Sequence, residues 1–213
     1  MPAPRRTQAE RTAATRAALL DAAVSALEQD GYAHLTTRGV AERAGVSQGT
    51  LQHHFATRSE LVAEALRHAN AQITADVVRR LDLADLRDPA RQEAALDELW
   101  RVHTSTAFTA ALEVWAAART DPELRPHVHA LERDVTRTID AAFSELLGGR
   151  GRERELLGVL DMTLATIRGL AMLAITVPRS ELDRRFEEAK THLLRAFSPA
   201  GPPRDRDRAR SGA

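Results

Sequence analysis

The sequence predicts an all-α fold, and three observations support this prediction. Apolar residues recur at intervals of three and four along nearly the whole chain, which is the period of an amphipathic helix. No stretch alternates apolar and polar residues convincingly enough to form a half-buried strand. Acid–proline pairs and glycines stand between the apolar stripes, where helices are expected to begin and end.

The first expected helix has an apolar stripe of Leu20, Val24 and Leu27 and should end at Gly31. Two short helices joined by a tight turn are then predicted within residues 36–55. A threonine pair offers the first N-cap, Gly45 gives the backbone freedom to end that helix, and Ser47 caps the next one. This arrangement is a helix-turn-helix, which indicates DNA binding.

The second helix of this motif is expected to be the one that reads DNA. Leu51 and Phe55 lie four residues apart on one face and should pack inward. The side chains left facing outward are mostly uncharged hydrogen-bonding groups, which suit base edges and phosphates. These residues are Gln48, Thr50, Gln52, His53 and His54.

The same region resembles the DNA-binding signature of the TetR family of bacterial transcriptional regulators. The matching residues are Thr37-Arg38, Ala41, Ala44-Gly45-Val46-Ser47, Gly49-Thr50-Leu51, His54-Phe55, Arg58 and Glu60-Leu61. The resemblance implies DNA contacts from Thr37, Arg38, Gln48, Gly49, Thr50, His53, His54 and Arg58. Gln52 stands where the family usually has Tyr, and its amide is a candidate for pairing with an adenine edge.

Further helices are expected after the motif. A capping box at residues 57–60 should open a helix whose stripe is Val62, Leu66, Ala69, Ile73 and Val77. Acid–proline pairs at residues 88–89 and 121–122 predict two more helix starts, and a break is expected within residues 104–107. A last helix should start near residues 178–180.

The helix expected within residues 152–177 is apolar on two sides, so one bundle core cannot cover it. The resemblance implies a homodimer in which the last two helices of each chain pack as a four-helix bundle, and the two-sided apolarity independently supports it. A helix buried wholly inside the monomer remains the alternative. A two-fold protein also suits a palindromic operator.

These elements suggest three regions: a helix-turn-helix DNA-binding domain at 8–55, a helical regulatory and dimerisation domain at 56–197, and a disordered tail at 198–213. The chain has 213 residues, no cysteine and a formal net charge of zero. Without an excess of positive charge, DNA attraction must come from locally placed arginines. No apolar run is expected to approach the roughly 20 residues that span a bilayer, so the sequence predicts a soluble, cytoplasmic protein.

The regulatory domain is where regulators of the resembled family bind a small-molecule effector. Large or adaptable side chains are the first candidates for contacting it, together with a few polar groups that orient it. The effector-binding candidates are Trp100, His103, Phe108, Trp115, Met162 and Thr166. Glu113, Thr163 and Arg168 are further polar candidates. Each could equally be an ordinary core or helix-surface residue.

Two other classes of protein are alternatives for this sequence: a helical metal-binding enzyme and an architectural DNA-coating protein. His127, His129 and Glu132 lie close in sequence, but a second metal-ligand pair is missing and no catalytic motif accompanies them, so neither an enzyme nor a metal site nor a cofactor is expected. An architectural DNA-coating protein would need a strongly basic chain. The sequence therefore predicts a dimeric, ligand-responsive regulator that represses by occupying an operator of double-stranded DNA, with activation as the alternative.

Overall fold

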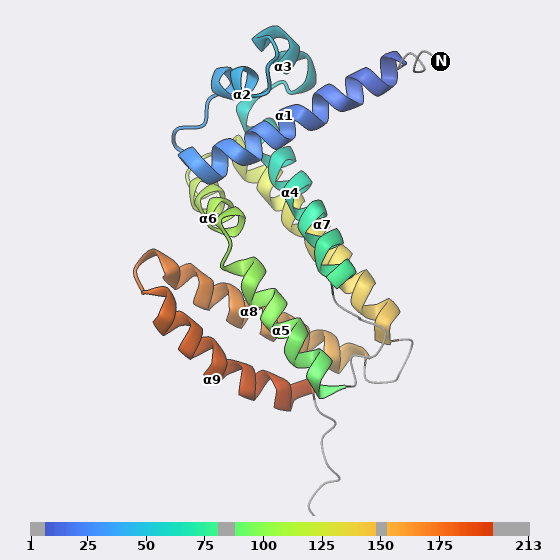
Figure 1. Cartoon of the computed structure of the whole chain (residues 1–213), viewed down its shortest axis with the longest axis vertical. Coiled ribbons are helices and arrows are strands. Elements are labelled where there is room, and N and C mark those ends of the chain that lie inside the picture. The colour runs from blue at the N-terminus through green and yellow to red at the C-terminus, as the bar shows by residue number, and fades with distance from the viewer. Residues whose placement is uncertain (1–6, 81–87, 148–152, 198–213) are drawn as a thin grey trace, which may run out of the picture.

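The computed structural model describes residues 7–80, 88–147 and 153–197, and these residues are helical nearly throughout (Figure 1). An upper part contains α1 (Gln8–Asp30), α2 (Thr37–Arg43) and α3 (Gln48–His54). Two long helices, α4 (Arg58–Arg80) and α7 (Leu124–Leu147), pack side by side and run from this part toward the other end. The all-α prediction is confirmed.

The remaining helices form a lower layer and a connection to it. α5 (Pro89–His103), α8 (Glu153–Met172) and α9 (Arg179–Phe197) pack on one another at the lower end, and a short 3-10 turn, Leu173–Ile175, follows α8. α6 (Thr106–Ala118) stands between this layer and α1. The expected break within residues 104–107 is confirmed, since α5 ends at His103 and Ser105 caps α6.

The helix starts follow the capping chemistry that the sequence predicts. Thr57 Oγ1 accepts from the amide of Glu60 at the start of α4. Asp88 accepts from the amide of Ala90 at the start of α5, and Asp121 accepts from the amide of Leu124 at the start of α7. These caps satisfy backbone donors that have no partner within the helix.

Buried apolar side chains form two clusters. The larger one joins α1–α4 to α6 and α7, so the expected domain boundary at residue 55 does not coincide with a gap in the core. The smaller one joins α5, α8 and α9 around Phe186, which is 1% exposed. The boundary therefore stays a prediction, and the expected tail at 198–213 lies outside the described residues.

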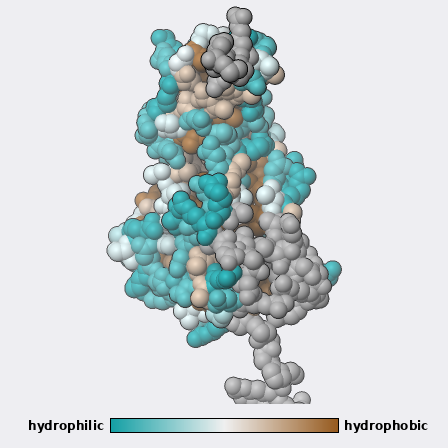
Figure 2. Space-filling model, turned by 45° about the vertical axis from the view of Figure 1, so that its right-hand side comes forward, coloured by the Kyte–Doolittle hydropathy of each residue, from teal (hydrophilic) through white to brown (hydrophobic). Residues whose placement is uncertain are grey.

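The outer surface is mostly hydrophilic in the face turned forward in Figure 2, where hydrophobic colour is confined to small strips. One helix departs from this rule. Met162 is 47% exposed and Met172 is 54% exposed on α8, and residues 154–175 are long and apolar enough to cross a membrane by length and composition alone. The expectation that no run reaches such a length was wrong, because few charged residues interrupt this helix.

A single lysine joins α5 to α9. Lys190 Nζ lies 2.8 Å from Asp97 Oδ1 and 2.9 Å from Glu187 Oε2. Burial opposes its charge, but the hydrogen bonds to these two carboxylates outweigh that cost and raise the pKa of Lys190 above its ordinary value. The amine therefore stays protonated and holds the two helices together.

Candidate DNA-binding and effector-binding sites

The second helix of the motif, α3, has the geometry of a recognition helix. Ser47 Oγ accepts from the amide of Thr50, while Leu51 and Phe55 are each 1% exposed and fix the inner face. The opposite face is open to solvent at Gln48, Gly49, Gln52 and His53, while Thr50 and His54 are half-buried. Gly45, with φ of 68°, provides the left-handed turn between α2 and α3. The structure thus brings the predicted reading residues to one helix.

Thr37 and Arg38 begin α2 beside this helix, as the sequence predicts. Thr37 is half-buried, whereas the Arg38 side chain is 79% exposed and its Nε donates to Glu42 Oε1 at 2.8 Å. A pair so exposed contributes little to stability. The guanidinium of Arg38 is therefore free to exchange Glu42 for a phosphate.

Arg58 has a different environment from the one that the sequence suggested. Its Nε donates to the carbonyl of Leu35 at 2.9 Å, its Nη2 donates to the carbonyl of Tyr32, and its guanidinium lies 4.1 Å from the centre of the Tyr32 ring. Two of its five N–H groups are thus bonded to the loop between α1 and α2. The DNA contact that the resemblance implies for Arg58 stays a prediction, and these bonds weaken it because they hold the guanidinium against the protein.

Two other arginines near the motif are also engaged by the protein. Arg16 of α1 pairs with Glu64 of α4 at 2.7 Å, and Arg43 pairs with Asp30 at 2.7 Å. Burial is the main cause that lowers the pKa of His54, and the nearby His53 and Arg16 lower it further, which favours the neutral imidazole. Within the described residues, Arg38 is the matched arginine best placed for a phosphate.

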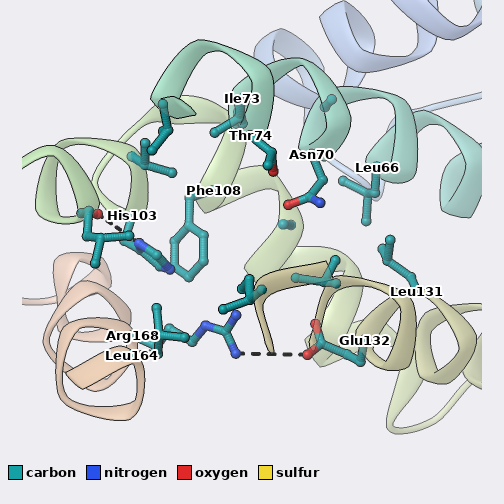
Figure 3. A pocket seen from close by; sticks show the side chains of 18 of the residues that line it. Leu66, Asn70, Ile73, Thr74, His103, Phe108, Leu131, Glu132, Leu164 and Arg168 are labelled. Atoms are coloured by element: carbon teal, nitrogen blue, oxygen red, sulfur yellow. Dashed lines mark hydrogen bonds and ion pairs between the residues drawn. The ribbon is translucent and has the colours of Figure 1, made fainter. Parts of the chain in front are cut away.

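A cavity of about 200 Å³ opens between α4, α5, α6, α7 and α8. Figure 3 shows its walls: Asn70, Ile73 and Thr74 of α4 face Leu164 and Arg168 of α8 across the space. Ile73 and Val77 belong to the apolar stripe that the sequence predicts for α4. Their side chains line the cavity rather than a closed core.

Three of the predicted effector contacts line this cavity: His103, Phe108 and Trp115. The rings of His103 and Phe108 lie 4.6 Å apart, and Phe108 meets Trp115 edge-on at 5.6 Å. His103 is 8% exposed and contacts the carbonyl of Leu99 through Nδ1 at 2.8 Å. Burial lowers the pKa of His103 to about 4, so the ring is neutral at pH 7.

Charged groups meet at one side of the cavity. Arg168, which the sequence suggested as a polar candidate, lies 4.0 Å from Glu132 between Nη1 and Oε2 (Figure 3). Arg168 Nε is buried without a hydrogen-bond partner among the described residues, and so is Trp115 Nε1. Each is a donor that a bound molecule could satisfy.

The other three predicted effector contacts lie away from the cavity. Trp100 stacks on Phe186 at 4.7 Å and donates its indole N–H to Asp183 at 2.7 Å, so it belongs to the core between α5 and α9. Met162 is exposed on the outer side of α8, and Thr166 bonds to the carbonyl of Met162 on the same helix. The effector contacts proposed for these three residues stay predictions that this cavity does not support, because bulk and helical spacing do not reveal which face meets it.

Two further polar candidates also serve other contacts. Thr163 is fully buried and donates to the carbonyl of Val159, which satisfies its hydroxyl within α8. Glu113 accepts from the amide of Tyr32 at 2.8 Å and so joins α6 to the end of α1. Asn70, Thr74 and Glu132 line the cavity and were missed as effector contacts. The predicted apolar stripe of α4 could have indicated the first two, which lie on the same helix between its members.

The surface cluster of histidines does not form a metal site in the part of the chain that the structure describes. No group of three or more His, Asp or Glu that could hold a metal occurs there. Glu132 of this cluster faces the cavity and Arg168 instead.

The capped α2–turn–α3 unit on a helical body defines a helix-turn-helix DNA-binding protein. Residues 19–65 match the model of the family described as bacterial regulatory proteins, tetR family. The chain is also 31% identical to the HTH-type transcriptional regulator CymR of Pseudomonas putida over 89% of this chain and 92% of the relative. The protein belongs to the TetR family, a family of transcriptional regulators rather than enzymes.

Solved structures agree with this fold. The multidrug binding protein EbrR complexed with imidazole has a TM-score of 0.61 and 25% identity, covering 88% of this chain and 97% of that one. The same protein complexed with ethidium has a TM-score of 0.57 and 29% identity, covering 87% and 99%. These structures are similar to this chain over nearly its full described length.

Proposed function

We propose that this protein is a dimeric transcriptional repressor that occupies a palindromic operator and leaves it when a small molecule enters the cavity. The observation that best supports this proposal is the placement of the cavity. Two of its walls, α4 and α6, also pack against α1 of the DNA-binding part. A ligand that moves either wall would therefore displace α1 and, through it, the helix-turn-helix that α1 supports.

Contacts from α4 to α1 are polar as well as apolar. Arg16 pairs with Glu64, and His68 Nε2 lies 2.8 Å from Asp21 Oδ1. Ile73 and Thr74 face the cavity less than two turns beyond His68 on the same helix. A displacement of α4 at the cavity would reach α1 through these contacts.

The DNA contacts proposed are Thr37, Arg38, Gln48, Gly49, Thr50, Gln52, His53 and His54, with Gln52 reading an adenine edge and Arg38 clamping a phosphate. Arg58 is left out because its bonds to the carbonyls of Tyr32 and Leu35 and its contact with the Tyr32 ring hold the guanidinium against the protein. Bidentate amide–adenine contacts typically give about 1 to 3 kcal/mol of discrimination. A protein that binds the chromosome in this way works in the cytoplasm.

The dimer is proposed to form through α8. Gly158, Met162, Ala165, Gly169 and Met172 are all exposed and recur at intervals of four and three, the spacing of a coiled-coil seam. Small residues at this spacing allow a second helix to approach closely. The exposed side of α9 is polar by comparison, since Arg184, Glu188 and His192 lie on it. We infer that α8 contributes most of the apolar contact and α9 flanks it.

An effector is proposed because the cavity is lined mainly by apolar side chains with a few polar groups, the composition of small-molecule sites. The similar protein EbrR is described as a multidrug binding protein and binds imidazole and ethidium. A cavity at this place would let this chain respond to a small molecule too.

The proposal is tested by sequencing the fragments that the purified protein retains from fragmented genomic DNA. We expect a palindromic site at a promoter, bound at least 1,000-fold more tightly than random DNA. In vitro transcription from that promoter should fall when the protein is added. Retention of random fragments alone would overturn operator recognition, and increased transcription would show activation instead of repression.

A further inference from the structure

We propose that the effector is a small organic anion: an apolar body of one or two rings bearing a carboxylate that Arg168 binds. This inference rests on the proposed function, because it names the chemistry of the molecule that enters the same cavity. Three features of the cavity support it: the unsatisfied donors, the position of Glu132, which is the one carboxylate among the described lining residues, and the volume.

The unsatisfied groups are both donors. Arg168 Nε and Trp115 Nε1 are buried without a partner among the described residues, and a guanidinium and an indole N–H have no acceptor capacity. Leaving a buried donor unpaired is costly, so a ligand with acceptor oxygens gains by meeting them. A carboxylate offers acceptors only and matches the planar guanidinium in two parallel hydrogen bonds.

Glu132 does not satisfy Arg168. Their closest atoms, Nη1 and Oε2, are 4.0 Å apart, which is beyond hydrogen-bonding distance. Figure 3 shows the Arg168 guanidinium extending into the cavity, with Glu132 beyond it near Leu131. The positive charge of Arg168 is therefore only loosely neutralised, and a ligand carboxylate can take a closer position than Glu132 does.

His103 adds a polar group of a different kind. Its ring is neutral at pH 7, and its Nδ1 contacts the carbonyl of Leu99, an acceptor, so Nδ1 must bear the proton. Nε2 is then an acceptor. His103 Nε2 can accept a hydrogen bond from a hydroxyl or another donor on the body of the ligand while Arg168 binds the carboxylate.

The volume limits the size of the ligand. An apolar cavity of about 150 Å³ is known to hold a benzene molecule. About 200 Å³ therefore accommodates one or two small rings with a carboxyl group. Phe108 and Trp115 meet edge-on in the wall and offer aromatic surface for such a ring.

Calorimetry with three probes tests the inference: 2-naphthoate, the neutral 2-naphthamide of nearly the same shape, and the cation proflavin. We expect 2-naphthoate to bind at least 10-fold more tightly than the amide. Arg168→Gln should weaken 2-naphthoate 10-fold to 100-fold and leave the amide unchanged. The matched control is Arg137→Gln on α7, because the Arg137 side chain is 77% exposed and pairs with Asp134 outside the cavity.

A second variant, Glu132→Gln, should change the affinity for 2-naphthoate in the opposite direction. This test does not require that Arg168→Gln folds stably. Glu132→Gln removes the competing carboxylate, so 2-naphthoate should bind more tightly. Equal binding of the acid and the amide would overturn the inference. The inference would also be overturned if proflavin binds and Glu132→Gln abolishes this binding, because the site would then take a cationic ligand. If the protein binds its operator but none of the three probes, the ligand class is wrong and the proposed DNA-binding function stands.

Discussion

Gly49 has room for a side chain within the protein itself. A Cβ at this position would lie 3.8 Å from Ser47 Oγ, an ordinary contact, and the residue is not in the left-handed region of backbone space. Nothing inside the chain therefore requires glycine in the first turn of α3. The lack of a side chain at Gly49 has an advantage only if another molecule, such as the DNA backbone, approaches this turn closely.

Gly49→Ala should consequently separate folding from DNA binding. Alanine is favoured over glycine in a helix by roughly 0.5 to 1 kcal/mol, so the variant should melt at the same temperature or slightly higher. Operator affinity, measured by fluorescence anisotropy, should nevertheless fall about 10-fold or more, because one methyl group then separates α3 from the phosphates. Unchanged affinity would show that DNA does not approach this turn.

His103 makes the stability of the protein depend on pH. Burial lowers the pKa of His103 to about 4, whereas the unfolded chain has a histidine pKa near 6.5. Between pH 6.5 and about pH 4 the unfolded state binds the proton and the folded state does not. The unfolding free energy therefore decreases as the pH is lowered through this range. By pH 5 this amounts to about 2 kcal/mol.

His103→Asn tests this dependence. Its side-chain amide can still donate to the carbonyl of Leu99 but does not titrate, so the loss of unfolding free energy between pH 7.5 and pH 5 should shrink by about 2 kcal/mol. Urea denaturation at each pH measures the difference. A parallel fall in both proteins would mean that His103 is protonated without cost and that carboxylates alone set the acid sensitivity.

Residue-level roles were only partly predictable from sequence. Arg38 and Arg58 both stand at helix starts beside the motif, and the sequence treats them alike. Folding separates them, because Arg58 contacts the Tyr32 ring and two carbonyls of the loop before α2, whereas the described side-chain partner of Arg38 is Glu42. Such carbonyls come from backbone geometry, which no side-chain pattern records.

At the scale of the element, α6 has two working faces. Ala110, Val114 and Ala118 pack into the core shared with α1–α4, while Phe108 and Trp115 line the cavity. Glu113 strengthens the first face by accepting the Tyr32 amide at the end of α1. A ligand that moves α6 therefore pulls on the corner that precedes the helix-turn-helix.

Removing this acceptor should loosen the corner. Glu113→Ala is expected to lower the unfolding free energy by about 1 kcal/mol and to speed amide exchange within residues 31–35. Hydrogen-exchange mass spectrometry and thermal melting measure both effects. Glu123→Ala is the matched control, since Glu123 is exposed at the end of the α6–α7 connection. If exchange at residues 31–35 is the same in both variants, the Glu113 contact does not hold the corner.

Most elements follow from local chemistry, which explains why their bounds were predictable. Asp88, Asp121 and Ser47 each cap the helix that the sequence assigned to them. The cavity was not predictable in this way, because it lies where the side chains of five helices do not fill the space between them. Trp100 and Trp115 look equivalent in sequence, yet only Trp115 borders that gap, and Trp100 is held by Phe186 and Asp183 from a distant part of the chain.

At the scale of the whole molecule, the proposed dimer depends on the exposed seam of α8. Ala165→Glu inserts a charge into this seam without disturbing the core, because Ala165 is exposed. The variant should be a monomer by light scattering. It should bind the operator at least about 100-fold more weakly, because two linked DNA-binding domains bind two half-sites with that much higher affinity than one domain binds one half-site.

Ala116→Glu is the matched control on α6, where alanine is also exposed but lies outside the seam. It should remain a dimer with normal affinity. A dimeric Ala165→Glu protein would place the interface elsewhere and leave the apolar side of α8 to another partner.

The contrast between the two tryptophans gives the protein a built-in optical sensor. The chain has only two tryptophans, and only Trp115 borders the cavity, with an indole N–H that lacks a partner among the described residues. Trp100→Phe would keep the stacked ring on Phe186 while removing the other emitter. Emission from such a protein would come from the cavity wall alone, so its colour and intensity would register a guest molecule directly, without dye, label or DNA.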